Sequence, residues 1–178
     1  MKLTDIQPLE DWTALEQDLH ERFHVDVNVF DTKGVRISEF KEWVNRLCPE
    51  IKATDKGQSF ICAVAHMNVA AMALQTREPQ IEECDAGLVK IVVPIFAEDE
   101  FVGAVGACGL LLDEGEIDTF LINKITEIEE ERAEQLATDI GRLSSEDARA
   151  LVDAVQKEID RILQSYIAGR RSSTEGDR

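Results

Sequence analysis

The stretch CDAGLVKIVVPIFAEDEFVGAVGACGLL, residues 84–111, decides the fold of this chain. Residues 88–96 and 101–111 are two runs rich in valine, isoleucine and other apolar residues, a composition typical of β-strands. The short acidic segment 97–100 lies between them and predicts a hairpin connection. A further short strand is expected at 81–84. This part of the chain therefore predicts a group of antiparallel strands.

Upstream of this stretch, the sequence predicts a second pair of strands. Valines at positions 25, 27 and 29 alternate with Asp26 and Asn28, which indicates a half-buried strand. The segment DTKG, residues 31–34, has the composition of a turn, and its glycine suits a left-handed conformation. Residues 35–37 then predict the returning strand.

Helical periodicity predicts helices around these strands. The predicted helices span residues 9–24, 40–47, 60–74, 118–128 and 145–166. The helix at 60–74 rests on an apolar stripe formed by Phe60, Val64, Met67, Ala71 and Leu74. The last helix, capped by Ser144 or Ser145, has a heptad-like seam that either packs back on the domain or pairs with a second copy. The order of elements predicts an α/β (α+β) fold with antiparallel strands in the middle.

Composition and charge restrict the function. The chain has 178 residues, of which 44% are hydrophobic, enough for one domain with a real core. Its formal net charge of −17 repels DNA, RNA and anionic membrane surfaces, so neither nucleic acid nor membrane is an expected partner. The opening residues have no basic segment followed by an apolar one, so we expect a cytoplasmic protein.

Four cysteines, Cys48, Cys62, Cys84 and Cys108, are the main candidates for a site. Thiols in a cytosolic protein stay reduced, which leaves metal binding, reactivity or plain burial. No two of them form a Cys-x-x-Cys pair, so a joint site has to be assembled by the fold. Soft thiolates select zinc, copper(I) or iron–sulfur clusters, and we expect a zinc ion or an iron–sulfur cluster here.

Two residues near the cysteines are candidate ligand-binding residues. His66 follows Cys62 by four residues and lies on the same helix face, where it replaces a thiolate or supports the site. Asp85 is adjacent to Cys84 and is placed to orient or tune the site. The alternatives are a histidine satisfied by packing and an aspartate that only forms a turn.

Common catalytic signatures are absent from the sequence. It contains no Gly-x-Ser-x-Gly, no His-Glu-x-x-His and no phosphate-binding Gly-Lys-Ser/Thr motif. The three glycines at 103, 106 and 109 lie within a strand pattern and do not form a dinucleotide-binding loop. We therefore expect no enzyme.

An ordered series of features resembles the PocR sensory domain, a PAS-like sensor family, over residues 8–130. The series comprises the turn at 31–34, Cys48, Cys62, the turn CDAGL at 84–88, the segment VPI at 93–95 and the glycine-rich strand at 103–109. The resemblance implies a PAS-like antiparallel sheet flanked by helices, with a long C-terminal helix. It also implies a sensor of small molecules such as short alcohols and diols, beside an output module.

We therefore predict a stand-alone cytosolic sensor that signals to a protein partner. Residues 1–142 form the sensory domain, 143–169 a C-terminal helix for signalling or homodimerisation, and 170–178 a disordered tail. The four cysteines bind a metal or an iron–sulfur cluster, a small molecule, or both. The alternatives are a metal-free binding module for a short alcohol or diol, and a thiol redox switch.

Overall fold

A computed structural model of the protein describes residues 1–175 and centres on a four-stranded antiparallel sheet. Its strands are β1 (Asp26–Phe30), β2 (Gln80–Glu83), β3 (Val89–Ala97) and β4 (Glu100–Cys108). They are arranged in the order β1-β4-β3-β2. The long hairpin of β3 and β4 supplies the two central strands, as the composition of this segment predicts. The predicted antiparallel sheet flanked by helices, with a long C-terminal helix, is confirmed.

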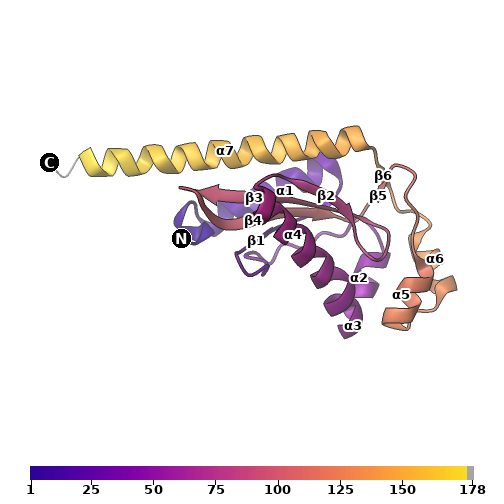
Figure 1. Ribbon diagram of the computed structural model, residues 1–178. Helices are drawn as coiled ribbons and strands as arrows, with labels where there is room; N and C mark the ends of the chain where they lie inside the picture. The colour runs from indigo at the N-terminus through magenta and orange to yellow at the C-terminus, as the bar shows by residue number, and fades with distance from the viewer. Residues whose placement is uncertain (176–178) are drawn as a thin grey trace.

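One face of this sheet forms the main hydrophobic core. Side chains alternate between the two faces of a strand, and the odd-numbered positions of β1, of β3 and of β4 from 103 to 107 share this face. Helices α1 (Leu9–Phe23) and α7 (Ser145–Glu175) cover it, and Figure 1 shows α7 running along the sheet. The core includes Trp12, Leu19, Val27, Val29, Ile91, Val93, Val105, Leu151 and Val155.

The heptad-like seam of the last helix packs within the chain. Its apolar side chains from Ala148 to Ile162 are buried in the core on this sheet face. Helix α7 begins where the serines predict, since the Ser144 hydroxyl accepts a hydrogen bond of 3.0 Å from the backbone N–H of Asp147. Residues 170–175 of the predicted tail continue this helix, and 176–178 lie outside the described residues.

Two predicted elements before the second cysteine are wrong. Residues 40–46 are not helical, and helix α2 (Leu47–Ala53) begins at Leu47 instead. Pro49 falls in the first turn of this helix, where the missing N–H of proline costs no hydrogen bond. The predicted strand at 35–37 is reduced to a single bridge between Phe30 and Arg36.

A continuous helical segment follows and contributes to both the fold and the site. It comprises α3 (Asp55–Gly57), a π-helical stretch η2 (Gln58–Ala63) and α4 (Val64–Thr76). The segment begins at Asp55, ahead of the predicted start at residue 60, because the Thr54 hydroxyl accepts a hydrogen bond from the Gly57 N–H and caps it. The stripe that predicts this helix faces solvent, with Phe60 and Met67 about 60% exposed.

Length and composition alone would let one described helix, Asp55–Thr76, cross a membrane. A third of that window is buried against the rest of the fold. Val69 and Ala73 pack there on the sheet residues Val92 and Ala104.

Smaller elements close the remaining side of the molecule. Helix α5 (Thr119–Thr126) lies within the predicted helix at 118–128, and a separate helix, α6 (Glu130–Ala137), follows it. The two-residue strands β5 (Leu111–Leu112) and β6 (Arg142–Leu143) form a parallel pair, and the short turn η1 (Leu3–Asp5) precedes α1. In Figure 1, α5 and α6 lie beyond the sheet end that α2 and α3 approach.

Candidate functional site

The sheet face opposite α7 borders a cavity of about 420 Å³ that all four cysteines line. Cys48 comes from α2, Cys62 from the π-helical stretch, Cys84 from the turn after β2, and Cys108 from the end of β4. The fold therefore brings to one cavity four thiols that are far apart in sequence, as predicted. All four are free thiols.

Strand register places charged side chains next to one of these thiols. Cys108 pairs with Asp26 on β1 and with Lys90 on β3, so the three residues form a row across neighbouring strands on one face. All three line the cavity. Gly106 is the next cavity residue of β4, and a Cβ atom there would lie 2.8 Å from the Phe30 ring. The absence of a side chain at Gly106 therefore leaves room for Phe30.

Burial keeps three of the thiols protonated. Loss of solvent raises the pKa of Cys48 well above its usual range, and the nearby Cys108 and Asp26 raise it further. The same desolvation raises the pKa of Cys62 to about 11 and raises the pKa of Cys84. A protonated thiol is a poor nucleophile and a poor metal ligand. At neutral pH these cysteines therefore present neutral, polarisable surface to the cavity.

The shared cavity does not amount to a preformed metal centre. Among residues 1–175, no three or more histidine, cysteine, aspartate or glutamate side chains are grouped so that they could hold a metal ion. The described cysteines line the walls of one space without converging as a ligand set.

His66, which the sequence predicts to be a ligand-binding residue, lies in the cavity wall. Its ring stacks on Phe30 with 3.9 Å between centroids, and its buried Nδ1 has no hydrogen-bond partner among the described residues. Desolvation lowers the pKa of His66 to about 3, and the charges of Lys90, Arg36 and Lys52 act in the same direction. The imidazole is therefore neutral at physiological pH.

The two acidic residues beside cysteines differ in position. Asp26 is 4% exposed; its Oδ1 accepts from the Val44 N–H at 2.9 Å, while its Oδ2 has no partner among the described residues. Burial raises the pKa of this carboxyl to about 6. Asp85, the predicted ligand-binding residue, is exposed in the turn after Cys84 and does not line the cavity.

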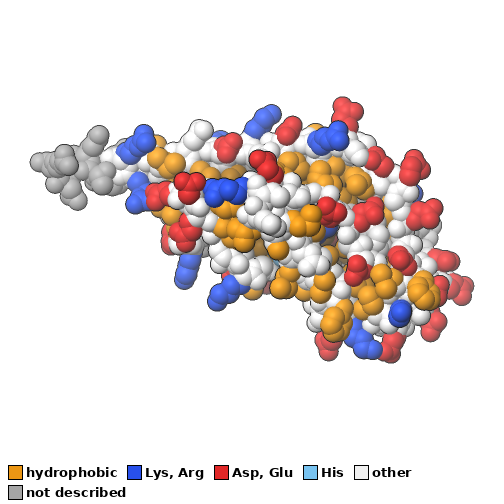
Figure 2. Space-filling view, viewed as in Figure 1, with side chains coloured by type: hydrophobic (Ala, Val, Ile, Leu, Met, Phe, Trp, Pro, Cys, Tyr) orange, Lys and Arg blue, Asp and Glu red, His pale blue; other side chains and the backbone are white. Residues whose placement is uncertain are grey.

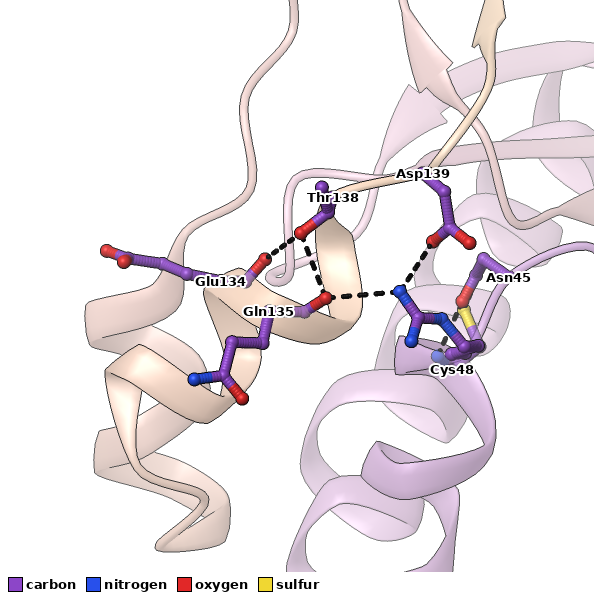
Figure 3. A network of polar contacts seen from close by, with 7 residues as sticks. Asn45, Cys48, Glu134, Gln135, Thr138 and Asp139 are labelled. Atoms are coloured by element: carbon purple, nitrogen blue, oxygen red, sulfur yellow. Dashed lines mark hydrogen bonds and ion pairs between the residues drawn. The ribbon is translucent and has the colours of Figure 1, made fainter.

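A polar network fixes Cys48 and the start of α2 (Figure 3). Asn45 Oδ1 accepts from the Cys48 N–H at 2.7 Å, and Asn45 Nδ2 donates to the Gly109 carbonyl at 2.6 Å. The neighbouring Arg46 donates to the Gln135 carbonyl and pairs with Asp139, both near the end of α6. The network therefore positions one cysteine from both the sheet and α6.

Several cavity residues were not identified from the sequence. They are Asp26, Asn28, Phe30, Arg36, Trp43, Lys52 and Lys90. A polar residue within a predicted strand, as at Asp26, Asn28 and Lys90, is the sequence feature that could have indicated some of them. Each lies on a buried strand, so its side chain faces either core or cavity.

The class of protein that the fold and the site define is a mixed α/β domain with a cavity lined by four thiols. The sequence matches the family described as the sensory domain found in PocR over residues 5–167, and the chain belongs to this family. No curated protein and no solved structure matches the chain. The resemblance noted from the sequence is thus confirmed, and the family is a sensory one.

Proposed function

We propose that this protein is a sensor that binds one small molecule, without a metal, in the cavity lined by the four cysteines. The observation that carries this proposal is the shared cavity itself, about 420 Å³ in volume. Pockets for small molecules typically have volumes of about 300–1,000 Å³, apolar walls and a few convergent polar groups. Membership of a sensory family supports the same function.

The cavity walls favour a ligand with an apolar body. Phe30, Trp43 and Leu88 line it together with the neutral thiols. Thiols that stay protonated behave as small, polarisable apolar groups. In this function the cysteines therefore contribute contact surface and shape, while polar neighbours select the ligand.

The proposed output passes through the sheet to α7. Strand β3 presents Lys90 to the cavity and Ile91 to the core on which α7 packs. A ligand that moves β3 therefore acts on both faces. A protein partner that contacts α7 is part of this proposal, as are a cytoplasmic location, a homodimer and the absence of catalysis.

The test begins with protein purified without oxygen. Elemental analysis, a visible spectrum and a thiol titration are expected to give no stoichiometric metal and four titratable thiols. Thermal stabilisation is then measured with two neutral probes, 1,2-propanediol and benzyl alcohol, and with benzoate. Stabilisation by any of the three supports a small-molecule site.

A matched pair of variants locates the binding. Ala65 lines the cavity, whereas Ala71 is exposed on the same helix and does not line it. Ala65→Phe is expected to abolish stabilisation by the probe, and Ala71→Phe to preserve it. Equal stabilisation of both variants would place the ligand elsewhere and contradict the proposal.

A zinc or iron–sulfur site remains the second candidate, because the four thiols share one cavity. It requires stoichiometric zinc, or iron with matching visible absorbance, and loss of that metal in Cys62→Ser/Cys84→Ser. The third candidate, a thiol redox switch, requires two of the thiols to disappear on mild oxidation and return on reduction.

A further inference from the structure

The charges around the cavity contrast with those of the whole protein. The chain carries a net charge of −17, and Figure 2 shows acidic side chains over much of one face, including the end formed by α5 and α6. The cavity wall has the opposite balance. Its charged residues are Lys33, Arg36, Lys52, Lys90 and Asp26. The cavity wall thus contains one carboxylate and four cationic side chains.

These cations form no direct ion pair with any acidic side chain among the described residues. None of the ion pairs found between described residues includes Lys33, Arg36, Lys52 or Lys90. Lys90 is only 7% exposed and lies 5.4 Å from the Phe30 ring centroid. Lys52 lies 4.8 Å from the Trp43 ring centroid. A buried lysine is ordinarily paired, and the one carboxylate in the wall, Asp26, leaves the cavity with an excess of positive charge.

The cations of the cavity also shift the pKa values of titratable groups around them. The charges of Lys90, Arg36 and Lys52 all lower the pKa of His66, after the larger effect of burial. Burial lowers the pKa of Lys52 itself, and Arg36 and Lys90 add to the decrease. Two of the cations also lower the pKa of Cys62, against the larger effect of desolvation. Residues from several elements therefore experience the same field.

We propose that the ligand is a small organic carboxylate, whose apolar body contacts Trp43 and Phe30 while its charged group lies among Lys52, Lys90 and Arg36. This inference rests on the proposed function and specifies its ligand class. The ammonium groups of Lys52 and Lys90 already lie over the rings of Trp43 and Phe30. The apolar body of a ligand and its carboxylate would therefore find their partners next to each other. Charge-assisted hydrogen bonds to lysine and arginine would supply the selectivity.

The experiment compares pairs of probes that differ in charge and share a body: benzoate with benzyl alcohol, and hexanoate with 1-hexanol. Binding to the full chain is followed by calorimetry and by Trp43 fluorescence at pH 7.5. At least one carboxylate is expected to bind about tenfold or more tightly than its alcohol, and its affinity is expected to fall with added salt.

Charge variants of opposite sign sharpen the test. Lys90→Met and Lys52→Met keep the apolar stem, and each is expected to weaken the carboxylate about tenfold while leaving the alcohol within about twofold. Asp26→Asn removes the single cavity carboxylate and is expected to tighten carboxylate binding. Lys124→Met is the control, because Lys124 is exposed on α5 and does not line the cavity.

Each outcome decides between the two proposals. The charge inference would be overturned if the alcohols bound as tightly as the carboxylates. It would also be overturned if neither lysine substitution weakened carboxylate binding. Both results would leave the proposed small-molecule site intact. Failure of every carboxylate to bind would also overturn the charge inference. Stoichiometric metal in the purified protein would instead overturn the proposed metal-free site. Lys52→Met and Lys90→Met come from different elements, so failure of one to fold leaves the other decisive.

Discussion

The two faces of the central sheet are both covered by other parts of the chain, but they differ in chemistry. On the α7 face, Val27, Ile91 and Val105 pack in a continuous apolar core. On the cavity face, the same strands present Asp26, Lys90 and Cys108. Apolar burial on the first face stabilises the fold, whereas the second retains buried polar groups without partners. Polar groups without partners, and not the degree of burial, therefore distinguish the cavity face, where we propose that the ligand binds.

The largest expected effect comes from adjacent residues of β3 that point to opposite faces. Ile91→Ala is expected to lower the free energy of unfolding by about 2–5 kcal/mol, because Ile91 is 1% exposed in the core. Lys90→Met is expected to cost less than about 1 kcal/mol, since it removes a buried charge that has no partner. Urea denaturation measures both, and similar losses would show that the two faces are not distinct.

The next effect concerns how stability depends on pH on the cavity face. The pKa of Asp26 is raised from 3.8 to about 6, so its contribution to stability is fully present below pH 3.8 and is lost as the pH rises through about 6. The shift corresponds to about 3 kcal/mol, before relaxation of the site reduces it. Relative to wild type, Asp26→Asn is expected to gain stability as the pH increases from 4 to 7.

Denaturation curves at several pH values test this prediction. Asp18→Asn serves as the control, because Asp18 forms an exposed ion pair with Arg22 outside the cavity. A constant difference between Asp26→Asn and wild type over this range would contradict the raised pKa.

A smaller effect distinguishes satisfied from unsatisfied polar groups. Asn45 is buried and bonded to both the Cys48 N–H and the Gly109 carbonyl. Asn45→Ala is expected to destabilise the protein by about 1–3 kcal/mol, because it leaves buried backbone groups unpaired. The rate of thiol labelling at Cys48 should rise in this variant. Unchanged stability and labelling would remove Asn45 from the support of the site.

The smallest effect is expected in the exposed part of the same network. Arg46 and Asp139 form an ion pair at 3.2 Å, with both side chains about 60% exposed. Arg46→Ala is expected to change the free energy of unfolding by less than about 1 kcal/mol, because solvent screens such pairs. A loss as large as that of Asn45→Ala would show that contact between α2 and α6 matters more than the buried amide.

Sequence reasoning located the sheet more reliably than the segments before the second cysteine. The runs in β3 and β4 are long and apolar, so they predict buried strands, and the structure pairs them as the central hairpin. Pro49, by contrast, is compatible with either the end or the beginning of a helix. The sequence analysis placed a helix before it, at 40–47, whereas the structure has helix α2 beginning at Leu47. The short segment 35–37 has too few residues for pattern to distinguish a strand from a bridge.

Only some of the residues that line the cavity could likewise be predicted from the sequence. The four cysteines and His66 were identified because their residue types are unusual, and the fold does bring them to one cavity. Lys52 and Lys90 were missed because lysine ordinarily indicates a solvated surface. Asp85 is adjacent to Cys84 in sequence but exposed outside the cavity, since neighbouring residues of a turn need not face the same way. Side-chain direction depends on register, which composition does not encode.

The length of α7 has a mechanical consequence. Its 31 residues span about 46 Å, whereas the nine residues of β3 span about 30 Å. Figure 1 accordingly shows the C-terminal part of the helix extending past the sheet. Arg170 nevertheless pairs with Glu98 in the turn between β3 and β4, so contact between the helix and the central hairpin reaches almost to the helix end. A tilt of α7 would therefore also displace the tip of this hairpin.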